Sequence, residues 1–174
     1  HFGLCNAITL LRLALIAALT AMLFSPAPPE TGAVWLAFAV AVAALALDGV
    51  DGWAARRAGL ASAFGARFDM EVDSAFALIL AFLAVDLGQA GPWVLALGLP
   101  RYLFWAAGQV WPWMQAHVPD RFSRKAVCVI QVGALVALLM PATPPALGVA
   151  LGVVAVAAVV WSFGRDILIL HARR

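Results

Sequence analysis

Charged residues are scarce in this chain: they make up 11% of its 174 residues, whereas hydrophobic residues make up 65%. A soluble domain of ordinary composition carries about 25% charged residues, which cover its surface. The shortage excludes such a domain and indicates that lipid covers much of the surface. The formal net charge of +2 is also too small for a basic surface that neutralises phosphates. We therefore expect no nucleic acid among the partners.

Cysteine is nearly absent as well. The two cysteines, Cys5 and Cys128, lie far apart and have no metal-ligand spacing. This excludes a disulfide framework and a zinc site. Both cysteines are expected to be small apolar residues.

Long hydrophobic stretches, by contrast, are abundant. A membrane helix needs about 20 apolar residues, and six stretches approach this length before Pro, Gly or polar residues end them. They cover residues 7–24, 32–55, 65–87, 91–112, 124–140 and 146–169. The first has no small-residue cleavage site behind it and is expected to be a retained span, not a signal peptide. The sequence thus predicts an all-α polytopic membrane protein with six transmembrane helices, forming one domain over residues 1–174.

Basic residues are distributed unevenly among the connections. The first, third and fifth connections contain no Lys or Arg, whereas the second and fourth connections and both chain ends do. The positive-inside rule therefore predicts that both termini are cytoplasmic. We expect an integral protein of the bacterial inner membrane, surrounded by membrane lipids.

Four aspartates lie inside the ends of apolar stretches, where an ionisable group is costly and indicates function. Asp48 and Asp51 are three residues apart, and Asp69 and Asp73 are four apart, so each pair shares a helix face. Four carboxylates at close quarters repel one another, and two divalent cations would balance them. Oxygen ligands favour Mg²⁺ or Mn²⁺, and a pair of such ions can hold a phosphoryl group during in-line displacement.

The residues beside these aspartates suit phosphate chemistry. Gly52 and Gly65 let a ligand approach the backbone, and Arg56 can place its guanidinium against phosphate oxygens. Each also has a structural alternative, because glycines pack helices together and an arginine at a helix end follows the positive-inside rule.

Taken together, these residues resemble the signature D-x2-D-G-x2-A-R-x8-G-x3-D-x3-D of the CDP-alcohol phosphotransferase (CDP-alcohol phosphatidyltransferase) family. All eight fixed positions are present: Asp48, Asp51, Gly52, Ala55, Arg56, Gly65, Asp69 and Asp73. The run from Asn6 to Arg12 is also similar to the opening N-x2-T-x2-R of the family.

The resemblance implies transfer of a phosphatidyl group from CDP-diacylglycerol to a small alcohol, with release of CMP. It implies that two divalent metal ions, Mg²⁺ or Mn²⁺, are held by Asp48, Asp51, Asp69 and Asp73, and that Asp73 is also the general base. The CDP-binding residues that it implies are Asn6, Thr9, Arg12, Gly52, Ala55, Arg56 and Gly65. It further implies a homodimer. The topology predicted from the basic residues places the active site on the cytoplasmic side.

The remaining basic residues near the membrane are candidates for binding the acceptor: Arg101, Arg124, Lys125 and Arg165. A phosphate on the acceptor would pair with them, which favours glycerol 3-phosphate or inositol phosphate over serine or choline. The run from Arg124 to Gln131 is loosely similar to the fifth span of phosphatidylglycerophosphate synthases. The alternative is internal: Arg165 pairs with Asp166 or another acid, while Arg124 and Lys125 are anchors at the lipid surface.

Glu71 lies between two motif aspartates but is expected to point off their face, as a partner for Arg67 four residues away. Two other functions stay open for the chain as a whole. A carboxylate cluster in a membrane could serve a cation or proton transporter, although no inverted repeat is present. A non-catalytic relative that binds a CDP-lipid is the second alternative, and the intact set of four aspartates disfavours it.

Overall fold

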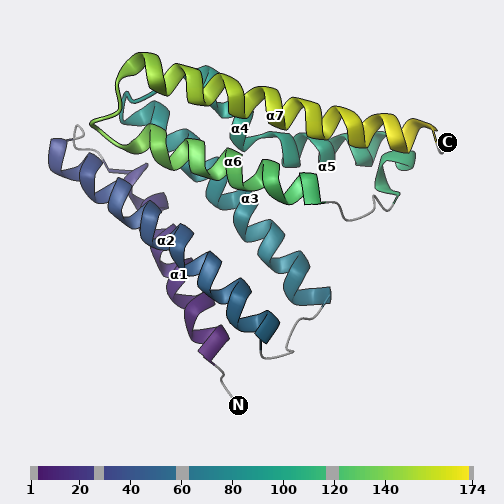
Figure 1. Cartoon of the computed structure of the whole chain (residues 1–174), viewed down its shortest axis with the longest axis horizontal. Coiled ribbons are helices and arrows are strands. Elements are labelled where there is room, and N and C mark those ends of the chain that lie inside the picture. Colours follow the sequence, from purple (N-terminus) through teal and green to yellow (C-terminus); the bar gives the residue numbers. More distant parts are fainter. Residues whose placement is uncertain (1–3, 26–29, 58–62, 117–121, 173–174) are drawn as a thin grey trace.

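The computed structural model describes residues 4–25, 30–57, 63–116 and 122–172, and for residues 4–7, 51–57, 63–67 and 122 it describes the backbone alone. Every regular element in these ranges is a helix (Figure 1), which confirms the all-α prediction. The long helices are α1 (Leu4–Met22), α2 (Thr31–Arg57), α3 (Ala63–Asp86), α6 (Phe122–Leu139) and α7 (Pro145–Ala172). Shorter helices connect α3 to α6: the 3₁₀ helix η1 (Pro92–Val94), α4 (Leu95–Gly98), α5 (Pro100–Val110) and the 3₁₀ helix η2 (Pro112–Gln115).

A helix lies over five of the six apolar stretches, and the remaining one, residues 91–112, is divided. Its two α-helices meet at Leu99, because Pro100 has no N–H group with which to continue the hydrogen bonding of α4. Near this break the side-chain amide of Gln131, on α6, donates a hydrogen bond to the backbone carbonyl of Leu97. A polar side chain from a neighbouring helix thus satisfies backbone that the proline disturbs.

The turn after α3 requires glycine. Gly88 has a φ of 66°, a left-handed conformation that other residues rarely adopt. Its N–H donates to the carbonyl of Val85, and the N–H of Gln89 donates to the carbonyl of Ala84. These two bonds form a Schellman motif, which ends α3 and turns the chain toward η1.

Helix α3 is central to the packing. It contacts α1, α4 and α6, while α1 also packs against α2 and α6 against α7. Its buried face carries Phe76, Leu80 and Leu83. Alanines line the buried face of α2, and small side chains of this kind let neighbouring helix backbones approach closely.

The outer surface is apolar, as expected for a chain with so few charges. On α7, for example, Val154, Val160 and Leu168 are 62%, 64% and 70% exposed. Among the described residues, α7 and the part of α2 from Thr31 to Val50 are long and apolar enough to cross a membrane.

The helices form two pairs that diverge. Figure 1 shows α6 beside α7 and α1 beside α2, with the pairs spreading apart toward the ends of α1 and α7 that lead to the chain termini. Helix α3 lies between the pairs. The candidate active site is formed where α3 faces α1 and α2.

Candidate active site

Three motif aspartates converge from two helices. Asp48 lies in the second half of α2, and Asp69 and Asp73 lie one turn apart in α3. One carboxylate oxygen from each of the three lies within 4.8 Å of the others. The packing of α1 against both α2 and α3 therefore places side chains far apart in sequence around one small volume.

Arg12, on α1, is the cation of this cluster. Its Nη1 atom lies 2.6 Å from Oδ1 of Asp48 and donates to Oδ1 of Asp69 at 3.1 Å. Its Nη2 atom donates to Oδ1 of Asp73. The Arg12 side chain is only 3% exposed, and a charge so deeply buried is tolerated because these carboxylates pair with it.

The cluster is open on one side. The side chain of Asp69 is 57% exposed, whereas those of Asp48 and Asp73 are 31% and 23% exposed. Asp69 is thus the most accessible of the three carboxylates and Asp73 the least accessible.

The three carboxylates fit a divalent metal ion. Mg²⁺ and Mn²⁺ prefer carboxylate oxygens, and each aspartate offers an oxygen to the same small volume. Asp51 follows Asp48 by one turn of α2, but its side chain lies outside the described part of the structure. Arg12 contacts an oxygen of each of these three carboxylates, so a metal ion and this guanidinium would bind the same three side chains.

The residues expected to bind CDP are only partly described. Thr9 is half-buried on α1, one turn before Arg12 and on the same helix face. The other positions fall within helices, but their side-chain surroundings lie outside the described part: Asn6 in α1, Gly52, Ala55 and Arg56 in α2, and Gly65 in α3.

Two of the candidate acceptor residues form ion pairs within the protein. Arg101, at the start of α5, donates through Nε to Oε2 of Glu71 at 3.5 Å and through Nη2 to Oε1. Arg124, near the start of α6, places Nε 3.3 Å from Oδ2 of Asp166 on α7. Both arginine side chains are 35% exposed, so part of each remains accessible to solvent.

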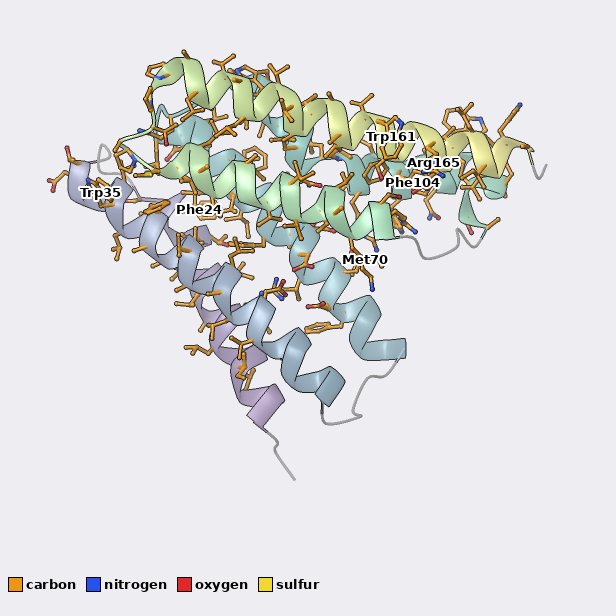
Figure 2. The ribbon with its side chains drawn as sticks, in the orientation of Figure 1. Phe24, Trp35, Met70, Phe104, Trp161 and Arg165 are labelled. Carbon is orange, nitrogen blue, oxygen red and sulfur yellow. The ribbon has the colours of Figure 1, made fainter. Side chains whose placement is uncertain are left out.

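The other two candidates are exposed. Lys125 follows Arg124 on α6. The guanidinium of Arg165 lies over the ring of Trp161, 5.5 Å from its centroid, and Figure 2 shows both side chains on α7. Asp166 pairs with Arg124, so the Arg165–Asp166 pair considered from the sequence is not the one that forms.

Sequence reasoning missed the partner of Glu71. The spacing of four residues suggested Arg67, whose side chain lies outside the described part, but Glu71 accepts hydrogen bonds from Arg101. The two residues are 30 positions apart and meet only because α5 folds back toward α3. The sequence shows that Glu71 and Arg101 have opposite charges, but it does not show which acid pairs with which base.

The fold and the site define a class of protein: a helical, apolar protein whose carboxylate cluster is suited to metal-assisted phosphoryl transfer. The sequence profile of the CDP-alcohol phosphatidyltransferase family matches residues 2–161, which is most of the chain. The chain therefore belongs to the CDP-alcohol phosphatidyltransferase family, whose members are enzymes that transfer a phosphatidyl group from a CDP-alcohol. No curated protein matches the chain.

Proposed function

We propose that the protein transfers the phosphatidyl group of CDP-diacylglycerol to a small alcohol and releases CMP. The observation that carries this proposal is the convergence of Asp48, Asp69 and Asp73, with one oxygen from each within 4.8 Å of the others. These are three of the four aspartates of the family signature, and the family profile matches the chain around them.

The reaction requires one bond to form and one to break. The acceptor hydroxyl oxygen attacks the β-phosphorus of the donor, the bond from that phosphorus to the anhydride oxygen breaks, and CMP leaves with the electron pair. Asp73 takes the proton from the attacking hydroxyl as a general base. Asp73 is less exposed than Asp69, and a general base that is shielded from bulk water suits this role.

Asp48, Asp51, Asp69 and Asp73 would hold two divalent ions, Mg²⁺ or Mn²⁺. Such ions supply charge stabilisation to a phosphoryl group in transfer. The amino-terminal residues Asn6, Thr9 and Arg12 and the motif residues Gly52, Ala55, Arg56 and Gly65 would bind the CDP portion of the donor. The half-buried side chain of Thr9, on the face of α1 that carries Arg12, supports this assignment.

The proposed setting is a bilayer. We infer six membrane spans, with α4 and α5 together forming the fourth, and cytoplasmic termini in a bacterial inner membrane. The uneven distribution of basic residues supports this topology, and so does the apolar surface of α7. A lipid-anchored donor and a water-soluble acceptor could then meet at the cytoplasmic membrane edge. A homodimer is the proposed assembly.

Glycerol 3-phosphate is the acceptor that we propose, as in a phosphatidylglycerophosphate synthase. The partly exposed guanidinium groups of Arg101 and Arg124, together with Lys125 and Arg165, could bind its phosphate. Inositol phosphate carries the same recognisable group, and an acceptor panel separates the two.

The test is acceptor-dependent release of CMP from CDP-diacylglycerol by the purified protein with Mg²⁺ or Mn²⁺. The panel contains glycerol 3-phosphate, inositol phosphate, inositol, serine and choline. Release with glycerol 3-phosphate alone, abolished by a chelator, is the expected result. Release with serine or choline instead would overturn the acceptor assignment. Absence of CMP release with every acceptor, despite binding of the CDP-lipid, would favour a non-catalytic relative. Flux of cations or protons into proteoliposomes that contain the protein would favour a transporter.

A further inference from the structure

Arg12 contacts the three aspartates that would bind a metal ion. Its two Nη atoms reach one carboxylate oxygen on each of Asp48, Asp69 and Asp73, and these are the residues whose oxygens lie within 4.8 Å of one another. The guanidinium is thus paired with all three carboxylates of the candidate metal site.

The charge of the cluster explains this position. Three carboxylates whose oxygens lie so close together carry three negative charges and repel one another. Arg12 supplies one positive charge and is 97% removed from solvent by its surroundings, since only 3% of the side chain is exposed. A guanidinium stays charged at any pH at which a protein is folded, so it cannot leave this role by losing a proton. Its contacts with the carboxylates can end only if the side chain moves away from them.

We infer that Arg12 and a divalent metal ion compete for Asp48, Asp69 and Asp73, so that Arg12 weakens metal binding until an anionic ligand takes up its guanidinium. The inference rests on the proposed function, because it concerns the same carboxylates. Two divalent cations would neutralise the four aspartates. The net negative charge that attracts the guanidinium of Arg12 would then be lost. The planar fork of the guanidinium suits a diphosphate, and Nε of Arg12 has no hydrogen-bond partner among the described residues. This buried donor would gain a partner if Arg12 turned away from the carboxylates to bind a phosphate.

A consequence is that metal and nucleotide bind cooperatively. If the metal displaces Arg12, the freed guanidinium favours the diphosphate, and the diphosphate in turn favours the metal by holding Arg12 away. Such coupling must be reciprocal for equilibrium binding.

The experiment measures Mn²⁺ binding to the full chain in detergent, from the loss of the electron paramagnetic resonance signal of free Mn²⁺. The proteins are the wild type, Arg12→Gln, Asp73→Asn and the control Asp86→Asn, whose lost carboxylate lies exposed at the far end of α3. We expect the Mn²⁺ dissociation constant of Arg12→Gln to be about tenfold lower than that of the wild type, within the usual range of coupling between ligands. Asp86→Asn should match the wild type.

A second arm adds CDP, with the Mn²⁺ bound by free CDP measured separately and subtracted. CDP should tighten Mn²⁺ binding to the wild type severalfold and should have a smaller effect on Arg12→Gln. Thermal unfolding without Mn²⁺ shows whether the variant is folded, and Mn²⁺ should raise the melting temperature of Arg12→Gln by more than that of the wild type.

Equal or weaker Mn²⁺ binding by Arg12→Gln, with normal binding by the wild type, overturns the competition and leaves the proposed function standing. An equal effect of CDP on Mn²⁺ binding by the wild type and Arg12→Gln overturns the coupling through Arg12 and also leaves the proposed function standing. Failure of every protein to bind Mn²⁺, with Asp73→Asn indistinguishable from the wild type, overturns the metal-dependent function itself.

Discussion

At Gly98, a single added methyl group would meet the backbone of a neighbouring helix. Gly98 lies at the end of α4, buried against α3. A Cβ atom at this position would lie 2.7 Å from Cα of Leu78, 2.9 Å from its Cδ1 and 3.2 Å from Cβ of Ala81. The nearest of these atoms belongs to the backbone of α3, so the clash cannot be relieved by turning one side chain, and the two helices must separate.

Overpacking of a well-packed core costs about 1–3 kcal/mol, and a clash with backbone belongs at the upper end, so Gly98→Ala should lose about 2–3 kcal/mol. For a chain of this length, that loss lowers the melting temperature by about 5–10 °C. The assay is thermal unfolding of the purified protein in one detergent, followed by circular dichroism.

Gly133→Ala is the matched control. Gly133 lies within α6, and a Cβ atom there would meet nothing within 4 Å. The same substitution should therefore gain up to about 1 kcal/mol, because alanine favours helix more than glycine does. An unchanged melting temperature for Gly98→Ala, or a fall of equal size in both variants, would refute the close contact between α3 and α4.

Three further predictions concern polar contacts and the metal. Gln131→Met should lower the free energy of unfolding by about 1–3 kcal/mol, since it leaves the Leu97 carbonyl without its side-chain donor. Urea unfolding measures this loss, and the control Gln109→Met, at an exposed site, should have little effect. Arg124→Gln should destabilise the protein by leaving the buried carboxylate of Asp166 unpaired, and Asp166→Asn in the same chain should recover part of the loss in a double-mutant cycle; additive losses would contradict the pair. Removal of divalent metal with EDTA should abolish CMP release, and added Mn²⁺ should restore it; full activity in EDTA would contradict a metal-dependent reaction.

Much of the helical framework follows from local sequence. Apolar stretches of membrane length, ended by Pro, Gly and polar residues, predicted helices at positions that agree with α1, α2, α3, α6 and α7. The division of the stretch from 91 to 112 was not predicted, although Pro100 was a signal for it. A count of apolar residues does not register the missing N–H group of one proline.

The part of the site that lies on one helix could also be predicted from local sequence. The spacing of Asp69 and Asp73 places them on one face of α3 because helix geometry is local. Their proximity to Asp48 and Arg12 depends on how α1, α2 and α3 pack, and no periodicity in the sequence contains that information. The family signature suggested which aspartates belong together, whereas the Arg12 contacts and the partner of Glu71 required the folded structure.

The central claim is that the carboxylates of α3 perform metal-dependent transfer from a CDP-lipid. The most direct measurement compares CMP release from CDP-diacylglycerol and glycerol 3-phosphate by the wild type, Asp73→Asn and Asp86→Asn, with Mg²⁺ present. Asp86 lies exposed at the other end of α3, so the same substitution there controls for changes in the helix. The account predicts that Asp73→Asn loses at least about 100-fold in rate, as expected for loss of a general base, while Asp86→Asn keeps the wild-type rate. Equal rates for Asp73→Asn and the wild type would contradict it.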